Sequence, residues 1–222
     1  MALLIAENIS KTYGEGTATV AALADASLRV AAGEFVAIMG ESGAGKSTLL
    51  SVLGAMNRPS TGRYVVDEID IYRLSADQRA DFRREYLGFV FQSFHLVPYL
   101  TAVENVALPL TAVSAAIRRK REMALEALDK VGMADKAQRL PSALSGGEKE
   151  RVAVARAIVN QPPIILADEP TGNLDSRNSQ EVMELLRRLN AAGTAVVMVT
   201  HSAASAGYAD RILTVTDGKL KK

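Results

Sequence analysis

The spacing of apolar and polar positions changes along the chain, and it predicts which segments form strands and which form helices. Residues 3–9 and the alternating apolar positions of residues 26–30 predict strands near the start. The continuous apolar run at residues 35–39 predicts a strand buried on both faces. A glycine-rich turn and a helical stretch at residues 46–55 follow it directly. A strand, a glycine loop and a helix in this order are the setting that a phosphate-binding loop needs.

The middle of the chain predicts helices, and the last third returns to alternating strands and helices. Apolar positions between residues 117 and 131 fall near one helical face, and Gly132 is a typical helix stop. The last third predicts a strand, a helix and two further strands, in order, at residues 164–167, 182–189, 195–200 and 212–216. This alternation indicates one α/β domain with a mostly parallel sheet and a helical insertion between its two halves.

Composition and charge narrow the function classes. The 222 residues suffice for one domain with a substantial core but hardly for two. The 26 Lys and Arg balance 25 Asp and Glu, so there is no electrostatic reason to expect nucleic acid. No apolar run approaches the roughly 20 residues that cross a bilayer, and residues 1–7 lack the features of a signal peptide. We therefore expect a cytoplasmic chain that does not insert into a membrane by itself.

Residues 40–47, GESGAGKS, fit the phosphate-loop pattern G-x-x-x-x-G-K-[ST] in full. Glycines let successive backbone N–H groups cradle phosphate oxygens, and the following helix N-terminus adds partial positive charge. We expect Lys46 to reach the β- and γ-phosphates and the Ser47 hydroxyl to bind Mg²⁺. A chance glycine turn is the alternative, and the position between a buried strand and a helix disfavours it. The nucleotide contacts expected here are Gly40, Glu41, Ser42, Gly43, Ala44, Gly45, Lys46, Ser47 and Thr48.

The strand at residues 164–167 is followed by two adjacent carboxylates, Asp168 and Glu169. Polar residues are common at strand ends, so this pair alone is weak evidence of a site. A phosphate loop, however, needs one carboxylate to hold Mg²⁺ and another to polarise the attacking water. We assign the first task to Asp168 and the second to Glu169.

Residues 144–148, LSGGE, allow two interpretations. Ser145 and Glu148 form the S-x-x-E capping box of a following helix. The box does not explain Gly146 and Gly147, since glycine inside a helix costs up to about 1 kcal/mol relative to alanine. Bare backbone beside a serine hydroxyl at a helix N-terminus is a second phosphate-binding device. The sequence leaves both interpretations open at this point.

The ordered combination of these three motifs resembles the nucleotide-binding domain of ABC ATPases, over nearly the whole chain. The resemblance implies an α/β fold, with a P-loop NTPase (RecA-like) core and a mostly parallel sheet. An N-terminal antiparallel β subdomain and a helical signature subdomain would complete the single domain. Core and β subdomain would occupy about residues 1–88 and 160–222, and the helical subdomain about 93–159. ATP and Mg²⁺ are the implied cofactors.

The same resemblance implies roles for four further residues. Tyr13 would stack on adenine, Gln92 would sense Mg²⁺ and the attacking water, Asp175 would lie in the D-loop, and His201 would contact the γ-phosphate. Tyr13 could instead be an ordinary strand aromatic, Asp175 a helix N-cap and His201 a structural histidine. The expected catalytic residues are Lys46, Gln92, Glu169 and His201. The expected metal ligands are Ser47, Gln92 and Asp168. The further nucleotide contacts are Tyr13, Ser145, Gly146, Gly147, Glu148 and Asp175.

The resemblance also implies partners. The subunit would form a head-to-tail homodimer around two ATP molecules, with Ser145 and Gly147 acting on the ATP of the other subunit. It would lie on the inner face of the cell membrane beneath a separate integral membrane permease, without binding nucleic acid. Part of residues 93–100 would form the groove that receives a coupling helix of that permease.

Within the family, residues 88–110 and 167–175 are similar to the group of the macrolide exporter MacB and the lipoprotein-releasing ATPase LolD. An ATPase like FtsE, which regulates a membrane partner without moving a substrate, is the main alternative. A module that holds ATP without turnover is disfavoured because Glu169 is present. ABC proteins of ribosomes carry two such domains and those of DNA repair a long coiled coil, and this chain has neither. Ser202 and Lys149 depart from common family residues without removing a chemical group.

Overall fold

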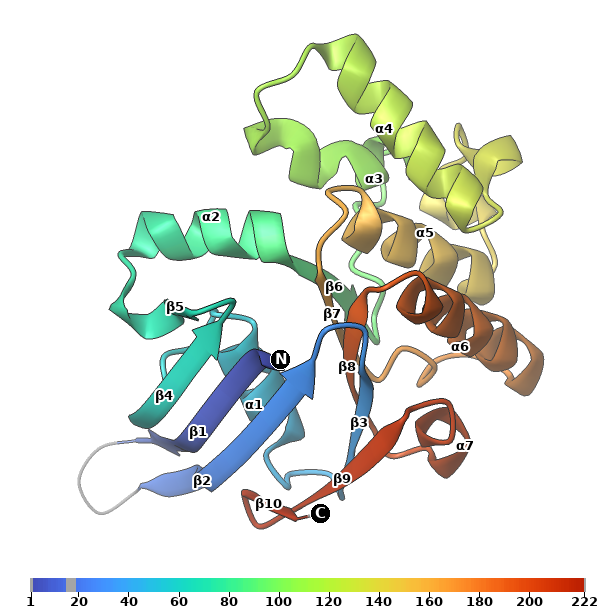
Figure 1. The fold of residues 1–222 in the computed structure, drawn as a ribbon. Helices are drawn as coiled ribbons and strands as arrows, with labels where there is room; N and C mark the ends of the chain where they lie inside the picture. Colours follow the sequence, from blue (N-terminus) through green and yellow to red (C-terminus); the bar gives the residue numbers. More distant parts are fainter. Residues whose placement is uncertain (1, 15–18, 222) are drawn as a thin grey trace.

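The computed structural model describes residues 2–14 and 19–221 (Figure 1). The strands are β1 (Ala2–Tyr13), β2 (Val20–Ala31), β3 (Phe35–Met39), β4 (Thr61–Val66), β5 (Ile69–Asp70), β6 (Leu87–Phe91), β7 (Ile164–Asp168), β8 (Ala195–Thr200), β9 (Arg211–Thr216) and β10 (Lys219–Lys221). The α-helices are α1 (Lys46–Leu53), α2 (Ala76–Tyr86), α3 (Ala102–Ala107), α4 (Ile117–Lys130), α5 (Gly146–Ile158), α6 (Ser176–Ala191) and α7 (Ala203–Ala206). Every strand and helix expected from the spacing is present, with ends that differ by a few residues.

The strands form two sheets. The first is antiparallel, with the order β2-β1-β4-β5, and the second has the order β10-β9-β3-β8-β7-β6. In the second sheet β9, β3, β8, β7 and β6 run parallel, and only β10 pairs antiparallel. The α/β class with an N-terminal antiparallel sheet and a mostly parallel second sheet is therefore confirmed.

The parallel sheet is covered on both faces, as the unbroken apolar run of β3 predicts. Phe35 and Ala37 point into a core shared with α3, α4, α5 and α6. Val36 and Ile38 point into a second core shared with α1 and the antiparallel sheet. Figure 1 shows α1 between the two sheets, with α5 and α6 beyond the parallel sheet. The parallel strands are thus held rigidly at the centre of the molecule.

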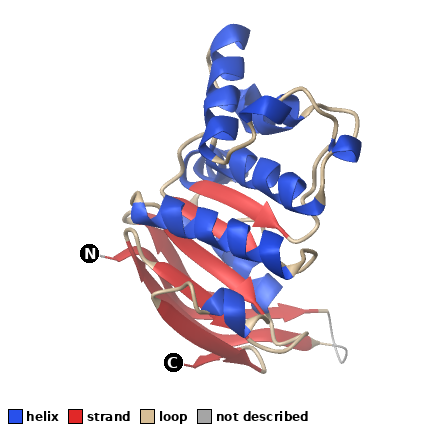
Figure 2. Ribbon diagram, turned by 90° about the vertical axis from the view of Figure 1, so that its right-hand side faces the viewer, coloured by secondary structure: helices blue, strands red, loops and turns tan. Residues whose placement is uncertain are grey.

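Helices α3, α4 and α5 pack on one another at one end of the molecule (Figure 2). The inner face of α4 is made of small and branched residues, among them the buried Ala124 and Leu128. The division of the chain into a core and a helical subdomain at residues 93–159 stays a prediction. Among the described residues, no helix combines the length and apolar character needed to cross a bilayer.

Candidate active site

Four neighbouring strands of the parallel sheet end at the same edge, and each delivers a residue expected to carry chemistry. Gly40 follows β3, His201 follows β8, Asp168 ends β7 and Gln92 follows β6. A cavity of about 700 Å³ lies at this edge. Its lining comprises Ala22, Glu41, Ser42, Gly43, Gly45, Lys46, Ser47, Thr48, Gln92, Asp168, Glu169 and His201. Apart from Ala22, all of these residues were expected at the site from the sequence.

The phosphate loop folds around its lysine. The Lys46 ammonium donates hydrogen bonds to the carbonyl oxygens of Gly40 (2.8 Å) and Glu41 (2.9 Å). Gly45 caps α1 with φ 103°, and a Cβ at this position would lie 2.3 Å from the Ala22 carbonyl oxygen. Only glycine fits this combination of positive φ and close approach. No side chain caps α1, so its first N–H groups face the cavity, where an anion is favoured.

Asp168 lies beside the phosphate loop and is half-buried. Burial raises the pKa of its carboxyl above the ordinary value, and the neighbouring charge of Glu169 raises it further. Lys46 and a hydrogen bond with Ser47 act in the opposite direction. Two like charges held close together at a sheet edge favour a cation between them and the phosphate loop.

Glu169 is held by His201 on the neighbouring strand. His201 Nδ1 lies 2.9 Å from Glu169 Oε1, and the His201 backbone N–H donates to Oε2 at 3.2 Å. The Glu169 side chain is 12% exposed and that of His201 67% exposed. Glu169 has φ 49°, in the left-handed region, which is strained for non-glycine residues and is common at functional sites. His201 is therefore no buried structural histidine.

The segment after Gln92 is held by residues that the motifs did not point to. Asn173 Nδ2 donates to the Gln92 carbonyl oxygen at 2.8 Å. At the other end, the Arg156 guanidinium donates to the carbonyl oxygens of Phe94 and His95 at 2.6 and 2.5 Å. Arg156 was detectable as the one charge in the apolar stretch of residues 152–159, whereas no sequence signal joins Asn173 to Gln92.

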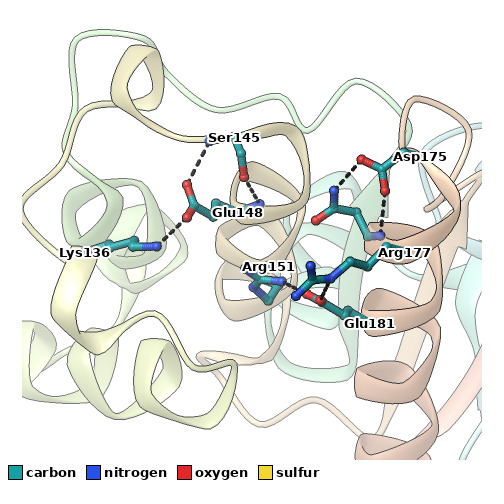
Figure 3. Close-up of polar contacts among 8 residues, drawn as sticks. Lys136, Ser145, Glu148, Arg151, Asp175, Arg177 and Glu181 are labelled. Carbon is teal, nitrogen blue, oxygen red and sulfur yellow. Dashed lines mark hydrogen bonds and ion pairs between the residues drawn. The ribbon is translucent and has the colours of Figure 1, made fainter.

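The LSGGE motif leads into the N-terminus of α5, where Figure 3 shows Ser145 and Glu148. None of its residues lines the cavity. Ser145 Oγ accepts from the Glu148 N–H at 3.3 Å, and Glu148 Oε2 accepts from the Ser145 N–H at 2.8 Å. Lys136 pairs with the same carboxylate and, with the Ser145 N–H, lowers the pKa of Glu148 to about 2. The capping box is therefore present. Ser145 and Gly146 remain exposed, so their polar groups can still reach a ligand.

Gly147 has a packing role that the sequence did not reveal, and its contact with a nucleotide stays a prediction. It is buried, and a Cβ there would lie 2.0 Å from Asn178 Oδ1 on α6. Gly146 has no such neighbour, since its nearest atom would be Leu174 Cδ2 at 3.4 Å. Gly147 thus permits the close packing of α5 on α6.

Asp175 and Tyr13 lie outside the cavity lining. Asp175 is the N-cap of α6, where Oδ1 accepts from the Asn178 N–H at 2.9 Å, and these hydrogen bonds lower its pKa. Tyr13 ends β1 with a 42% exposed side chain, and its hydroxyl accepts from Asn57 Nδ2 at 2.5 Å. Lys11 Nζ lies 5.1 Å from the Tyr13 ring centroid. Roles of either residue toward a nucleotide stay predictions.

The residues present fit Mg²⁺ that arrives with a nucleotide. Among the described residues, no group of three or more His, Cys, Asp and Glu side chains is arranged to hold a metal on its own. Asp168 and Ser47 both line the cavity and supply one carboxylate and one hydroxyl. Mg²⁺ commonly takes one or two protein oxygens and completes its shell with phosphates and water.

A phosphate loop between a parallel strand and a helix, with paired carboxylates on a neighbouring strand, defines a P-loop NTPase. Comparison with protein families identifies one family within this class. The family profile described as ABC transporter matches residues 23–172. The chain belongs to this family, whose ATP-binding domain binds and hydrolyses ATP.

Relatives and solved structures agree with this assignment. The chain is 47% identical to the uncharacterized ABC transporter ATP-binding protein YvrO of Bacillus subtilis, over 98% of this chain and 95% of that protein. It is 47% identical to the macrolide export ATP-binding/permease protein MacB of Salmonella typhimurium, over 99% of this chain but 34% of MacB. The dimeric ATP-binding cassette MJ0796 with ADP and Pi superposes with a TM-score of 0.90 at 42% identity, covering 99% and 97% of the two chains. CbiO1 of Clostridium perfringens, part of the transporter complex cbiONQ, has a TM-score of 0.89 at 28% identity, covering 100% and 87%.

Proposed function

We propose that this chain hydrolyses ATP as the motor subunit of a membrane transport complex, with its cavity residues in defined roles. The bare N–H groups of the phosphate loop and Lys46 bind the phosphates. Ser47, Asp168 and Gln92 would hold Mg²⁺, which would supply positive charge beside the transferred phosphoryl group. Glu169 takes a proton from the attacking water, and His201 contacts the γ-phosphate. The observation that carries this proposal is the convergence of these groups on one cavity at four adjacent strand ends.

The Glu169–His201 contact supports a resting state in the single subunit. The carboxylate accepts from the ring and the backbone of His201, so its orientation is tied to that of His201. A γ-phosphate within reach of His201 would compete for the imidazole and release Glu169. ATP would then help to assemble the arrangement that hydrolyses it, as a ligand that binds one of two states more tightly does.

A head-to-tail homodimer would complete the site. Ser145 and Gly146 are exposed at a helix N-terminus but lie outside the cavity of their own chain. A second copy placed against the cavity would bring these groups to the γ-phosphate. The dimeric cassette MJ0796 with ADP and Pi is a relative in which two such domains associate.

We further propose that the subunit acts on the inner face of the cell membrane, beneath a separate permease. A second cavity of about 560 Å³ lies between α2, β6, the 3₁₀ helix η2 (Leu108–Ala112) and α5, and His95 lines it. A coupling helix of a permease could bind there, next to the segment that begins at Gln92. MacB carries an ATP-binding part and a permease in one protein, and this chain spans about a third of it.

We prefer the subgroup of MacB and LolD, in which ATP hydrolysis drives a permease mechanically in lipoprotein release or export. Two observations favour it. These are the 47% identity to MacB and the 42% identity to MJ0796, against 28% to CbiO1. An FtsE-like regulator that moves no substrate is the second candidate. The extracytoplasmic part of the permease would distinguish the two, because it determines whether a cargo is bound.

Glu169→Gln tests the proposal. The amide cannot accept the proton of water, so we expect ATP hydrolysis to fall at least about 100-fold. ATP should now hold the subunit as a dimer, detected by light scattering, while the wild type with ATP returns to monomers. A variant as active as wild type would exclude Glu169 as the base. A variant that binds ATP but stays monomeric would show that dimerisation needs the permease.

A further inference from the structure

Asn173 joins two segments of the site that are 81 positions apart in sequence. Its Nδ2 donates to the backbone carbonyl oxygen of Gln92 at 2.8 Å. Asn173 lies in the turn between β7 and α6, just after Glu169. This turn is kept compact by hydrogen bonds from the Gly172 N–H to the Glu169 carbonyl oxygen (2.9 Å) and from the Leu174 N–H to the Thr171 carbonyl oxygen (3.1 Å).

The Gln92 side chain also lies against this turn. A Cβ built at Gly172 would lie 2.7 Å from Gln92 Nε2, so the amide passes directly over the glycine. Gln92 is exposed. Among the described residues, no group other than Asn173 Nδ2 donates a hydrogen bond to its backbone carbonyl oxygen. Asn173 is thus the polar anchor of its backbone.

The rest of the segment is strained and is fixed from the opposite side. Phe94 and His95 have φ 59° and 47°, an arrangement that costs on the order of 1 kcal/mol or more per non-glycine residue. Both of their carbonyl oxygens accept from the Arg156 guanidinium. A strained segment persists only where its surroundings hold it. Without the Asn173 anchor, Gln92 would join the end of β6 to this strained segment with no described hydrogen bond to its own carbonyl oxygen.

We propose that Asn173 is a positioning residue for ATP hydrolysis. Its hydrogen bond fixes the Gln92 backbone and so sets the distance of the Gln92 amide from Mg²⁺ and from the water that Glu169 activates. Asn173 lies outside the cavity lining and would act only through Gln92. This inference rests on the proposed role of Gln92 in the site.

The test is a double-mutant cycle between Asn173 and Gln92. Loss of one hydrogen bond of ordinary strength should lower kcat for ATP about 3- to 10-fold in Asn173→Ala. KM for ATP should stay within about twofold, because the phosphate loop that binds ATP is unchanged. The Mg²⁺ concentration for half-maximal rate should rise, which a merely structural effect would not cause. In the Gln92→Ala background, Asn173→Ala should have no further effect.

Two variants serve as controls. Asn173→Asp has the same shape without the N–H donor and should be impaired at least as much as Asn173→Ala. Gln180→Ala removes an exposed amide hydrogen bond of similar length, from Nε2 to Glu184 Oε1 at 2.9 Å on α6, and should leave kcat unchanged. Thermal unfolding of each variant establishes that it is folded.

The outcomes separate this inference from the proposed function. If Asn173→Ala equals wild type, or if its effect multiplies with that of Gln92→Ala, Asn173 does not act through Gln92. If Gln92→Ala alone leaves kcat and the Mg²⁺ requirement unchanged, the role proposed for Gln92 is wrong and the inference fails with it.

Discussion

At the scale of single residues, Glu150 stands apart from every other carboxylate described. It is 0% exposed on the inner side of α5, and both of its carboxylate oxygens lack a hydrogen-bond partner. Burial raises its pKa to about 8, although Arg156 counteracts this. Buried groups without partners are rare in native proteins. At neutral pH the protonated form is therefore the stable form of this side chain.

This residue makes protein stability depend on pH. The unfolded chain loses the Glu150 proton near pH 4.5 and the folded chain near pH 8, so the folded state binds more protons between these values. Stability then falls as pH rises through this range and levels off above it. Glu150→Gln removes the titration and should match wild type at pH 5 but exceed it by about 3–4 kcal/mol at pH 8.5.

Urea unfolding at the two pH values measures this difference. A Glu150→Gln variant with the same advantage over wild type at pH 5 and pH 8.5 would contradict the prediction. Glu104→Gln, an exposed capping glutamate on α3, is the control, and its effect should not grow with pH in this range.

Sequence reasoning works well at this scale where partners are close in the chain. Ser145 and Glu148 are three positions apart, so their capping box was predictable. The reason why position 147 needs glycine was not predictable, because Asn178 is 31 positions away and contacts Gly147 only through tertiary packing. Likewise, nothing in the sequence indicates that Glu150 has no partner.

At the scale of elements, α5 and α6 pack closely at Gly147 and are linked by an ion pair. Arg151 of α5 binds Glu181 of α6 at 2.6 Å, and Arg177 of α6 binds the same carboxylate at 3.2 Å (Figure 3). The two helices begin with the LSGGE residues and with Asp175. Their contact therefore fixes the position of one motif relative to the other.

Gly147→Ala tests this contact. The new methyl group meets Asn178 Oδ1 at 2.0 Å and Cβ at 2.9 Å, so α6 must shift or Asn178 must give up its hydrogen bond to Asp175. We expect a loss of about 1–3 kcal/mol in the free energy of unfolding. Gly146→Ala is the matched control, and its methyl group has room. Equal stability of the two variants in urea unfolding would mean that close packing is not the role of Gly147.

The elements themselves were predictable because their patterns are local. Apolar runs identified β3, β7 and β8, and the one-sided pattern of residues 117–131 identified α4. Helices α2, α3 and α7 and strands β4, β5, β6 and β10 were not predicted. Most of these segments are too brief to display a period. Helix α2 has 11 residues but buries only Phe82, so it shows no apolar stripe.

At the scale of the whole molecule, the sequence predicted the parallel sheet and the site but not the order of strands. β8 lies between β3 and β7, which places His201 beside Glu169 although 32 positions separate them. Such an order arises from crossover connections, which no local pattern encodes. The N-terminal antiparallel sheet and the role expected of His201 came from the resemblance to ABC ATPases and not from the periodicity.

The proposed dimer predicts complementation between two damaged subunits. Lys46→Ala damages the cavity of its own chain. Ser145→Asp keeps the helix cap but repels the phosphates bound by the partner. In a mixed dimer one site carries both lesions and the other carries neither, so mixing the inactive variants should restore ATP hydrolysis to a substantial fraction of wild type. A mixture as inactive as its components would exclude action across the dimer, and mixing Lys46→Ala with itself is the control.

The exposed position of Ser145, outside the cavity of its own chain, has a consequence for inheritance. If the LSGGE residues of each subunit act on the ATP of its partner, a mutant subunit that still folds and dimerises also disables a site on a wild-type subunit. The fraction of dimers with two intact sites then equals the square of the fraction of wild-type subunits. A substitution that leaves folding intact but spoils Ser145 would therefore behave as partly dominant, whereas one that prevents folding would be recessive.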